Sequence, residues 1–193
     1  LLAGAVVGSL PALLGMHRWM LPMNRNVEIK ARAVDLAAVE DKVRKLANEG
    51  PILLEQEDVF FRCPQGRLKL RRLADAGEGE LIAYNRPDAS GPKESRYLVY
   101  RTNDPDGLCS TLAEAIGLRG IVRKRRTFYR VGQTRVHLDR VEGLGDFVEL
   151  EVVLGDGQDA REGAAIAREL MLRLGISEDR LLKTAYIDMM EVR

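Results

Sequence analysis

The chain has 193 residues, of which 46% are hydrophobic and 31% are charged, proportions that are ordinary for a soluble globular protein and exclude intrinsic disorder. The length suits one domain with its own core, and the 30 lysines and arginines nearly balance the 29 aspartates and glutamates, which argues against a basic surface for nucleic acid. Two cysteines, Cys63 and Cys109, are too far apart in sequence for a CxxC site, so we expect passive thiols in a reducing, cytoplasmic environment.

Residues 1–23 differ in character from the rest of the chain, and we set them apart as an N-terminal extension to a domain over residues 24–193. Their apolar run lacks charge until His17 and Arg18, is short for a membrane-spanning helix, and is broken by Pro11. No basic segment precedes the run, as a signal peptide would require. Two interpretations stay open, an upstream extension or fragment edge and a truncated signal or anchor. For the domain itself we expect no membrane partner.

The first predicted strand, residues 26–32, alternates polar and aliphatic residues. Because successive side chains of a strand point to opposite faces, all of its polar side chains share one face. That face carries Asn26, Glu28, Lys30 and Arg32. One such strand is also typical of an antiparallel sheet with one face in water. The pattern becomes informative because it recurs in later strands.

Three helices are predicted between groups of strands. Residues 35–46 place apolar side chains at 36, 39, 43 and 46 behind a capping Asp35, and this segment is expected to close at Gly50 and Pro51. Further helices are expected over residues 106–116 and 160–174, each followed by a glycine.

The remaining strands are predicted to be antiparallel and joined by short turns. They are expected over residues 55–63, 67–73, 80–86, 95–101, 120–131, 134–141 and 146–154. With the first strand there are about eight, which favours an α+β, mostly β fold, a closed eight-stranded antiparallel barrel with flanking helices. Such a barrel removes free edges and can hold one ligand. The loop 88–93 is interpreted as an exposed turn, with a lid as the alternative.

The polar faces of the later strands carry charges rather than the Ser, Thr and Gln that are usual on solvated faces. The basic members are Lys69, Arg71, Arg86, Lys124, Arg126 and Arg135. The acidic members, which join Glu28, are Asp139, Glu149 and Glu151. Between 122 and 128 a basic pair points each way in either register, and we take Lys124 and Arg126 as inward because they are in phase with Val122.

Charges that face into a closed barrel are costly unless they pair or bind a ligand. Guanidinium and ammonium groups favour phosphate, and carboxylates favour a hard divalent cation such as Mg²⁺ or Mn²⁺. The sequence therefore predicts a site for a metal-bound polyphosphate. We interpret His137 as a member of a polar network and Asp58 as the ion-pair partner of a nearby arginine. The aromatic residues of the strands are interpreted as core or rim residues rather than base-stacking platforms, namely Tyr97, Tyr100, Phe128 and Tyr129.

At this point the chain resembles a known family, the CYTH domain, which is shared by class IV adenylate cyclases and thiamine triphosphatases and is also called the triphosphate tunnel enzymes. The resemblance covers nearly all of residues 24–190 and is carried by QEDVFF, GRLKLR, LIAYNRPD, KESRY, VRKRRTFY, HLDRVEGLGDFVELE and TAYIDMM. GRLKLR and the LDxVEGLGxFxELE run look closest to the class IV cyclase-like branch. The family hallmark Glu-x-Glu-x-Lys is matched as Asn26-x-Glu28-x-Lys30, and Asn26 is a departure because its carbonyl oxygen carries no charge.

The resemblance implies an eight-stranded antiparallel tunnel that binds a triphosphate with one or two divalent metals, Mg²⁺ or Mn²⁺. It implies metal ligands at Glu28, Glu149 and Glu151, with Asp139 close by. It implies substrate-binding residues at Lys30, Lys69, Arg71, Arg86, Lys124 and Arg126, to which we add Arg135. Glu28, Lys30 and Arg126 are the candidate catalytic residues.

Three functions are open. In the cyclase-like function, which is slightly favoured, the ribose 3′-hydroxyl of ATP attacks the α-phosphorus and pyrophosphate leaves. In a tripolyphosphatase or thiamine triphosphatase, a metal-activated water attacks the terminal phosphorus. The departure at Asn26 motivates a third function, a non-catalytic module that binds polyphosphate or a nucleotide. The expected partner is a small-molecule triphosphate, bound by a monomer or a homodimer.

Overall fold

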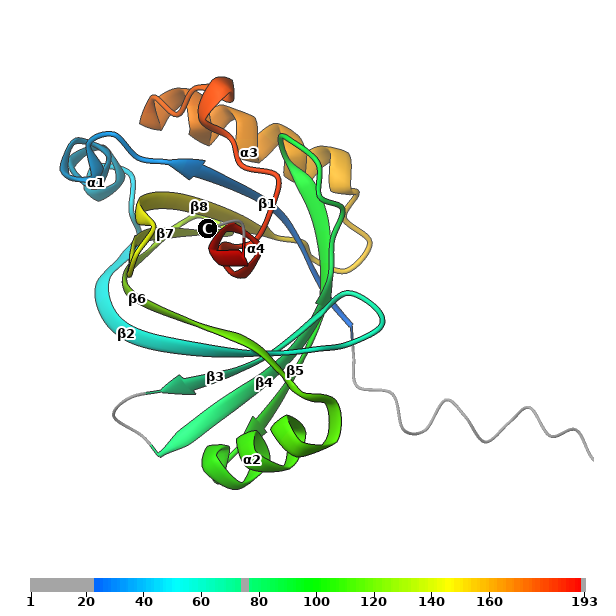
Figure 1. Ribbon diagram of the computed structural model, residues 1–193. Coiled ribbons are helices and arrows are strands. Elements are labelled where there is room, and N and C mark those ends of the chain that lie inside the picture. The colour runs from blue at the N-terminus through cyan, green and yellow to red at the C-terminus, as the bar shows by residue number, and fades with distance from the viewer. Residues whose placement is uncertain (1–22, 74–76, 192–193) are drawn as a thin grey trace, which may run out of the picture.

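In a computed structural model, which describes residues 23–73 and 77–191, eight antiparallel strands close into one barrel (Figure 1). Their order around the barrel is β1-β5-β4-β3-β2-β6-β7-β8. The strands are β1 (Asn24–Arg32), β2 (Glu49–Phe61), β3 (Arg67–Leu73), β4 (Glu78–Asn85), β5 (Lys93–Thr102), β6 (Leu118–Val131), β7 (Thr134–Val141) and β8 (Gly145–Val153). The predicted closed eight-stranded barrel is therefore confirmed. The predicted extension, apart from Met23, lies outside the described residues.

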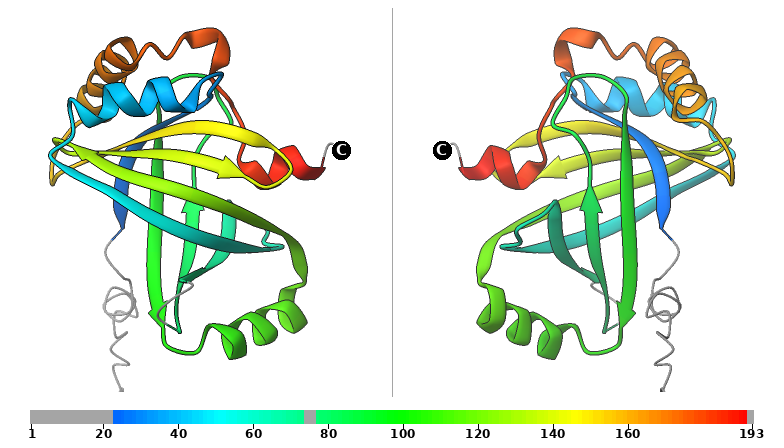
Figure 2. Two further views of the ribbon diagram at one scale, coloured as in Figure 1. Left: turned by 90° about the vertical axis from the view of Figure 1, so that its left-hand side faces the viewer. Right: turned by 90° about the vertical axis from the view of Figure 1, so that its right-hand side faces the viewer.

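Helices flank the barrel on two opposite sides (Figure 2). The α-helices are α1 (Leu36–Arg44), α2 (Pro105–Ile116), α3 (Ala160–Leu174) and α4 (Tyr186–Glu191), and a 3₁₀ turn, η2, spans Glu178–Arg180. Helices α1 and α3 pack on each other and on β8, whereas α2 packs on β2, β3 and β4. Helix α4, which the sequence did not predict, lies within the outline of the strands when the barrel is viewed as in Figure 1.

The helix boundaries follow local chemistry. The first turns of α1, α2 and α3 are capped by the carboxylates of Asp35, Asp104 and Asp159. Helix α3 ends at Gly175, whose φ of 76° is a left-handed conformation that strains residues with a side chain. Helix α1 ends before the predicted position because β2 begins at Glu49, so that Gly50 and Pro51 belong to a strand rather than to a turn.

The main apolar core lies between the outer face of the barrel and helices α1 and α3. Val27 and Ile29 of β1 are at most 1% exposed there and pack in one cluster with Leu170 and Leu174 of α3. At Gly163 the helix approaches β1 so closely that an added Cβ would lie 2.8 Å from Cγ2 of Val27. The outward aliphatic residues thus hold the helices, and their polar neighbours on each strand point into the barrel.

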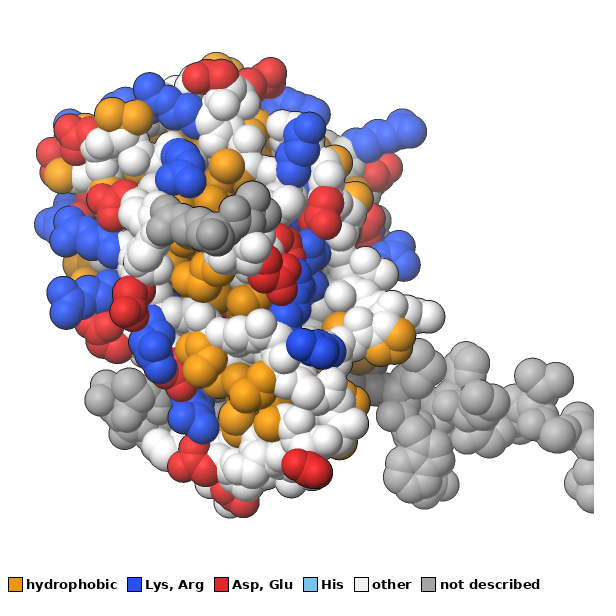
Figure 3. Space-filling model, in the orientation of Figure 1, with side chains coloured by type: hydrophobic (Ala, Val, Ile, Leu, Met, Phe, Trp, Pro, Cys, Tyr) orange, Lys and Arg blue, Asp and Glu red, His pale blue; other side chains and the backbone are white. Residues whose placement is uncertain are grey.

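The outer surface shows no single-signed patch in the view of Figure 3, where acidic and basic side chains are interspersed. Within residues 23–73 and 77–191, no helix has both the length and the apolar character needed to cross a membrane. Cys63 and Cys109 are both free.

Candidate functional site

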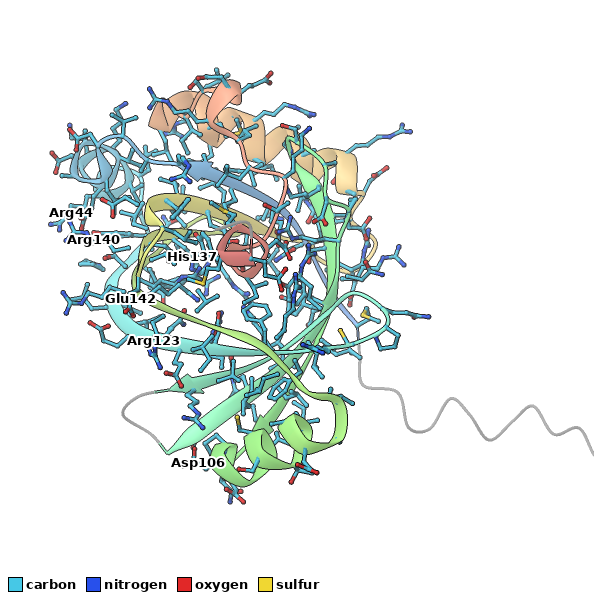
Figure 4. The ribbon with its side chains drawn as sticks, viewed as in Figure 1. Arg44, Asp106, Arg123, His137, Arg140 and Glu142 are labelled. Atoms are coloured by element: carbon cyan, nitrogen blue, oxygen red, sulfur yellow. The ribbon has the colours of Figure 1, made fainter. Side chains whose placement is uncertain are left out.

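A cavity of about 430 Å³ occupies the barrel interior. Most of the residues predicted for the site line it, namely Glu28, Lys30, Lys69, Arg71, Arg86, Arg126, Arg135, Glu149 and Glu151. Two predicted residues, Lys124 and Asp139, are buried behind this lining. The inward register of β6 is as predicted, since the side chain of Arg126 is 4% exposed and those of Arg123 and Arg125 are 57% and 76% exposed. Figure 4 shows Arg123 on the outside of the barrel and His137 within it.

Strand β1 supplies an acid and a base, as its alternation predicted. Its antiparallel pairing with β8 sets Glu28 opposite Glu151 and Lys30 opposite Glu149. The ammonium of Lys30 donates to Oε1 of Glu149 at 2.9 Å. Glu28 forms an ion pair at 2.9 Å with Arg86 of β4. The barrel closure therefore joins the acidic residues of β1 and β8 in one wall.

Arg126 is the most heavily bonded cation of this wall. Its guanidinium donates two hydrogen bonds of 2.6 Å to Asp139 and one of 2.7 Å to Glu149. Asp139 is fully buried, and its Oδ2 also accepts from the hydroxyl of Tyr186 at 2.9 Å. Asp139, a predicted metal ligand, therefore binds Arg126, its cross-strand neighbour, and does not line the cavity.

On the opposite wall, Asp58 forms ion pairs with three cations, whereas the sequence predicted one arginine partner. Its carboxylate accepts from Lys69 at 3.0 Å, from Lys124 at 2.7 Å, and from Arg71 at 2.8 and 3.1 Å. The Asp58 side chain is 2% exposed. The two lysines come from β3 and β6, which both pair with β2, so this cluster depends on three adjacent strands.

The inward ion pairs leave a positive surplus at the Asp58 cluster. Among the predicted site residues and Asp58, seven cations meet five carboxylates, through the pairs Lys30–Glu149, Lys69–Asp58, Arg71–Asp58, Lys124–Asp58, Arg86–Glu28, Arg126–Asp139, Arg126–Glu149 and Arg135–Glu151. The Arg101–Glu80 pair also lines the cavity, and the buried Lys93 of β5 donates to backbone carbonyls. Around Asp58 three cations share one carboxylate, whereas in the other pairs of this set four cations meet four carboxylates. The Asp58 cluster therefore carries two positive charges in excess, which suits an anionic ligand.

Burial governs the protonation of this cluster. It lowers the pKa of Lys124 to about 7, although Asp58 opposes the shift. Burial alone would raise the pKa of Asp58, but Arg71, Lys124 and Lys69 hold it well below its usual range. The lowered pKa of Asp58 favours its charged form, because Asp58 faces three cations. The lowered pKa of Lys124 favours its neutral form, because Lys124 is buried and shares its one carboxylate with Arg71 and Lys69. We conclude that Asp58 is ionised and that Lys124 titrates near neutrality.

The acidic wall is where a divalent cation would bind. Burial raises the pKa of Glu28 to about 7, with Arg86 opposing and with Glu149 and Glu151 adding to the shift, so these carboxylates repel one another. In the described part of the chain, no three Asp, Glu, His or Cys side chains are gathered closely enough to hold a metal ion, and each carboxylate is paired with a cation.

The donor atoms nevertheless fit a hard cation. On the same face as Glu28, the side-chain oxygen of Asn26 is buried and has no hydrogen-bond partner among the described residues. Carboxylate and amide oxygens are the ligands that Mg²⁺ and Mn²⁺ prefer. Glu28, Glu151 and Asn26 therefore fit such a cation, provided that Glu28 and Glu151 release their basic partners.

Two further residues, His137 and Tyr186, lie in the barrel interior. His137 is 6% exposed, and its Nε2 lies 3.6 Å from Glu151, beyond a good hydrogen bond. Tyr186 of α4 lines the cavity, with the Lys30 ammonium 3.5 Å from its ring centroid. Tyr186 was not predicted as a site residue because it lies beyond the last strand, in a segment without strand periodicity. Its place in the TAYIDMM motif was the available signal.

Comparisons with known proteins agree with this geometry. The model of the CYTH domain matches residues 24–186. The adenylate cyclase CyaB of Aeromonas hydrophila is 29% identical over 171 residues, which cover 83% of this chain and 85% of the relative. The solved PH1012 protein of Pyrococcus horikoshii OT3 is similar with a TM-score of 0.76 and 29% identity, over 84% of this chain and 98% of that one.

A solved Hippeastrum protein, described as having a dominant triphosphatase activity, is 14% identical with a TM-score of 0.62, over 88% of this chain and 95% of that one. At that identity the likeness concerns the fold alone. The family match, in contrast, spans all eight strands and the charged cavity that they enclose. The chain belongs to the CYTH domain family.

Proposed function

We propose that the protein is a divalent-metal-dependent enzyme that binds ATP in the barrel cavity and converts it to cyclic AMP and pyrophosphate, in the manner of the class IV adenylate cyclases. The observation that carries the proposal is the division of the interior into a cation-rich cluster around Asp58 and an acidic wall on β1 and β8. The similarity to the Aeromonas hydrophila cyclase supports the choice of reaction.

The cations around Asp58 bind the phosphates in this proposal. Lys69 and Arg71 line the cavity, and Lys124 stands behind them with its ammonium on the same carboxylate oxygen as Lys69. Arg86 and Arg135 extend the positive lining on the adjoining strands. A triphosphate that enters would replace part of the Asp58 contact with its own oxygens, which a guanidinium fork binds in the same bidentate way.

Lys30 and Arg126 are the cations of the acidic wall, and they are proposed to act on the reacting phosphates. When the 3′-hydroxyl oxygen bonds to the α-phosphorus, its proton passes to water, the bond to the pyrophosphate oxygen breaks and negative charge grows on the leaving group. Fixed cations stabilise such charge without reorganising. The contacts of Lys30 and Arg126 to Glu149 hold both cations in place for this task.

Glu28, Glu151 and Asn26 would hold the metal, with Glu149 beside them. A bound Mg²⁺ or Mn²⁺ supplies neutralisation of phosphate oxygens and polarisation of the phosphorus centre. Asn26 offers oxygen without charge, so we expect this site to hold its cation more weakly than three carboxylates would.

The decisive experiment incubates the protein with ATP, thiamine triphosphate or tripolyphosphate, each with Mg²⁺ or Mn²⁺, and identifies the products. We expect cyclic AMP and pyrophosphate from ATP. Orthophosphate release would assign the triphosphatase reaction instead, and binding without turnover would assign the non-catalytic module.

A Glu151→Gln variant tests the metal assignment. We expect the Mn²⁺ concentration for half-maximal turnover to rise at least about tenfold, because a cavity ligand loses its charge. Glu142→Gln is the matched control, since Glu142 is exposed in the turn between β7 and β8 (Figure 4). Equal metal requirements in the two variants would refute the assignment.

The pKa of Lys124 predicts a pH dependence of anion binding. Lysine is cationic below its pKa, so the surplus positive charge is full at pH 6 and reduced at pH 8. Tripolyphosphate should therefore bind the native protein about tenfold more tightly than it binds Lys124→Met at pH 6, and the difference should nearly vanish at pH 8. The affinities are measured by calorimetric titration. Because both proteins are titrated with the same ligand at each pH, the ionisation of the ligand does not affect the ratio of the two affinities. A constant ratio across this range would contradict the prediction.

A further inference from the structure

His137 carries two buried ring nitrogens, and neither has a hydrogen-bond partner among the described residues. The imidazole points into the barrel from β7, where it lies opposite Phe128 of β6 and Glu149 of β8. It meets the ring of Phe128 edge-on, with 5.7 Å between the two centroids. This packing holds the ring in place but does not use its nitrogens. Buried polar groups are normally paired, so the nitrogens call for a partner that they acquire in the working state.

Glu151 is the acceptor within reach of His137, and it is loosely held. Its Oε2 lies 3.6 Å from Nε2 of His137 and 3.5 Å from Nη1 of Arg135. The other two carboxylates of the acidic wall, Glu28 and Glu149, each have a cation at 2.9 Å or closer. Of these three carboxylates, Glu151 therefore gives up the least when it accepts a new ligand.

A divalent cation on Glu151 would act differently on its two neighbours. It would repel the guanidinium of Arg135, whose side chain is 35% exposed and can turn to solvent. Burial and the nearby charge of Arg126 lower the pKa of His137, so its imidazole is neutral at pH 7 and does not repel a cation. A neutral imidazole has one N–H to donate. A displacement of about half an ångström would bring Nε2 within hydrogen-bond distance of Glu151.

On the basis of the proposed function, we infer that His137 is a positioning residue of the metal site, whose Nε2–H holds Oε2 of Glu151 and leaves Oε1 for the divalent cation. Both contacts of Glu151 with its neighbours are to Oε2. A hydrogen bond to a metal-binding carboxylate fixes its orientation, and the loss of such a bond typically weakens metal binding about 10- to 100-fold. The edge contact with Phe128 fixes the donor in turn.

The test measures Mn²⁺ binding without substrate, from the electron paramagnetic resonance signal of free Mn²⁺. His137→Phe keeps a ring against Phe128 but removes both nitrogens, and the Kd for Mn²⁺ should rise at least about tenfold. The amide nitrogen of glutamine can lie near the position of Nε2, and that of asparagine near Nδ1. His137→Gln should therefore keep the Kd within about threefold of the native value, whereas His137→Asn should weaken binding about as much as His137→Phe.

Two controls separate positioning from a general disturbance of the interior. In a Glu151→Gln background, His137→Phe should weaken Mn²⁺ binding by no more than about twofold further, because His137 acts through that carboxylate. Arg140→Gln is the matched control on β7, since Arg140 is exposed on the outside of the barrel (Figure 4), and its Kd should stay within about twofold of the native value. Tripolyphosphate binding in EDTA needs no metal, so it should be unchanged within about twofold in every variant and reports that each is folded.

The possible results separate the role of His137 from the proposed function. If the native protein binds no Mn²⁺, the metal-dependent function is wrong and the role of His137 falls with it. If the native protein binds Mn²⁺ and His137→Phe binds it equally well, the role of His137 is refuted and the proposed function stands. Equal losses in the Gln and Phe variants, or a full further loss in the Glu151→Gln background, also refute it. Losses in the Phe and Asn variants with recovery in the Gln variant support it.

Discussion

Replacing Arg126 by methionine is expected to lower the free energy of unfolding by about 3–5 kcal/mol, the largest single effect that the structure predicts. Arg126 donates three hydrogen bonds of 2.6–2.7 Å to Asp139 and Glu149, and its side chain is 4% exposed. Methionine has a comparable length but no donor. The fully buried Asp139 would keep only the hydroxyl of Tyr186, and a carboxylate without its cation is costly to bury.

Urea unfolding at pH 7 measures this loss, and Arg125→Met provides the control. Arg125 is the next residue of β6, points outward with 76% of its side chain exposed, and pairs with the exposed Glu55. Its replacement should change the free energy of unfolding by no more than about 0.5 kcal/mol. The double variant Arg126→Met with Asp139→Asn should recover part of the loss, because the amide carries no charge. The explanation fails if the Arg126 and Arg125 variants are equally stable.

The second large effect is expected from Asp58→Asn. The substitution keeps the shape of the side chain but removes the charge shared by Lys69, Arg71 and Lys124, so one buried and two half-buried cations lose their counter-ion. We expect the free energy of unfolding at pH 7 to fall by about 3 kcal/mol. Added tripolyphosphate should restore much of it, because an anion that binds the folded state at this place stabilises it by mass action.

The measurement is the rise in melting temperature on adding tripolyphosphate, which should be larger for Asp58→Asn than for the native protein. Glu57→Gln is the control, since Glu57 is the preceding residue of β2 and pairs with Arg72 and Arg123 at the surface. Its response to tripolyphosphate should match that of the native protein. Equal responses in the Asp58 variant would show that Asp58 does not occupy the place of a phosphate.

The stability that Asp58 contributes also has a defined pH range. Its pKa in the folded protein lies well below the value of about 3.9 expected for the unfolded chain. A carboxylate with a depressed pKa stabilises the folded protein fully when the pH is above its pKa in the unfolded chain. This stabilisation is lost as the pH falls through its pKa in the folded protein. The stability difference between the native protein and Asp58→Asn should therefore stay constant from pH 5 to pH 6, below the titration of Lys124, and shrink only under about pH 4.

The alternation of side chains predicted the strands of the barrel and most of the residues that face its interior, although in β6 it allowed either register. Strands have a period of two, so one outward row of aliphatic residues fixes the inward row, as in β1 and β8. The partners of each inward charge were not predictable, because they depend on how the barrel closes. Asp58 contacts Lys124 because β2 pairs with β6, and Asp139 contacts Arg126 because β6 pairs with β7.

The start of β2 and the last helix, α4, were also hard to predict, because both depend on contacts with distant parts of the chain. Residues 49–54 of β2 follow directly on a helical segment and contain Gly50 and Pro51, which locally favour a turn, yet pairing with β6 draws them into a strand. Helix α4 is short, and its position is set by contacts such as that of Tyr186 with Asp139. Neither contact has a signature in the local sequence.

The pairing of β1 with β8 makes the formation of the site depend on contacts between distant parts of the chain. Lys30 and Glu149 touch across 119 residues of sequence, and β2 and β6 are likewise distant along the chain. Contacts of such long range form only after large loops have closed, and proteins that depend on them fold slowly. No contiguous half of the chain contains both walls of the cavity. The acidic wall should therefore be among the last features to assemble during folding and among the first to be lost when either terminal strand detaches.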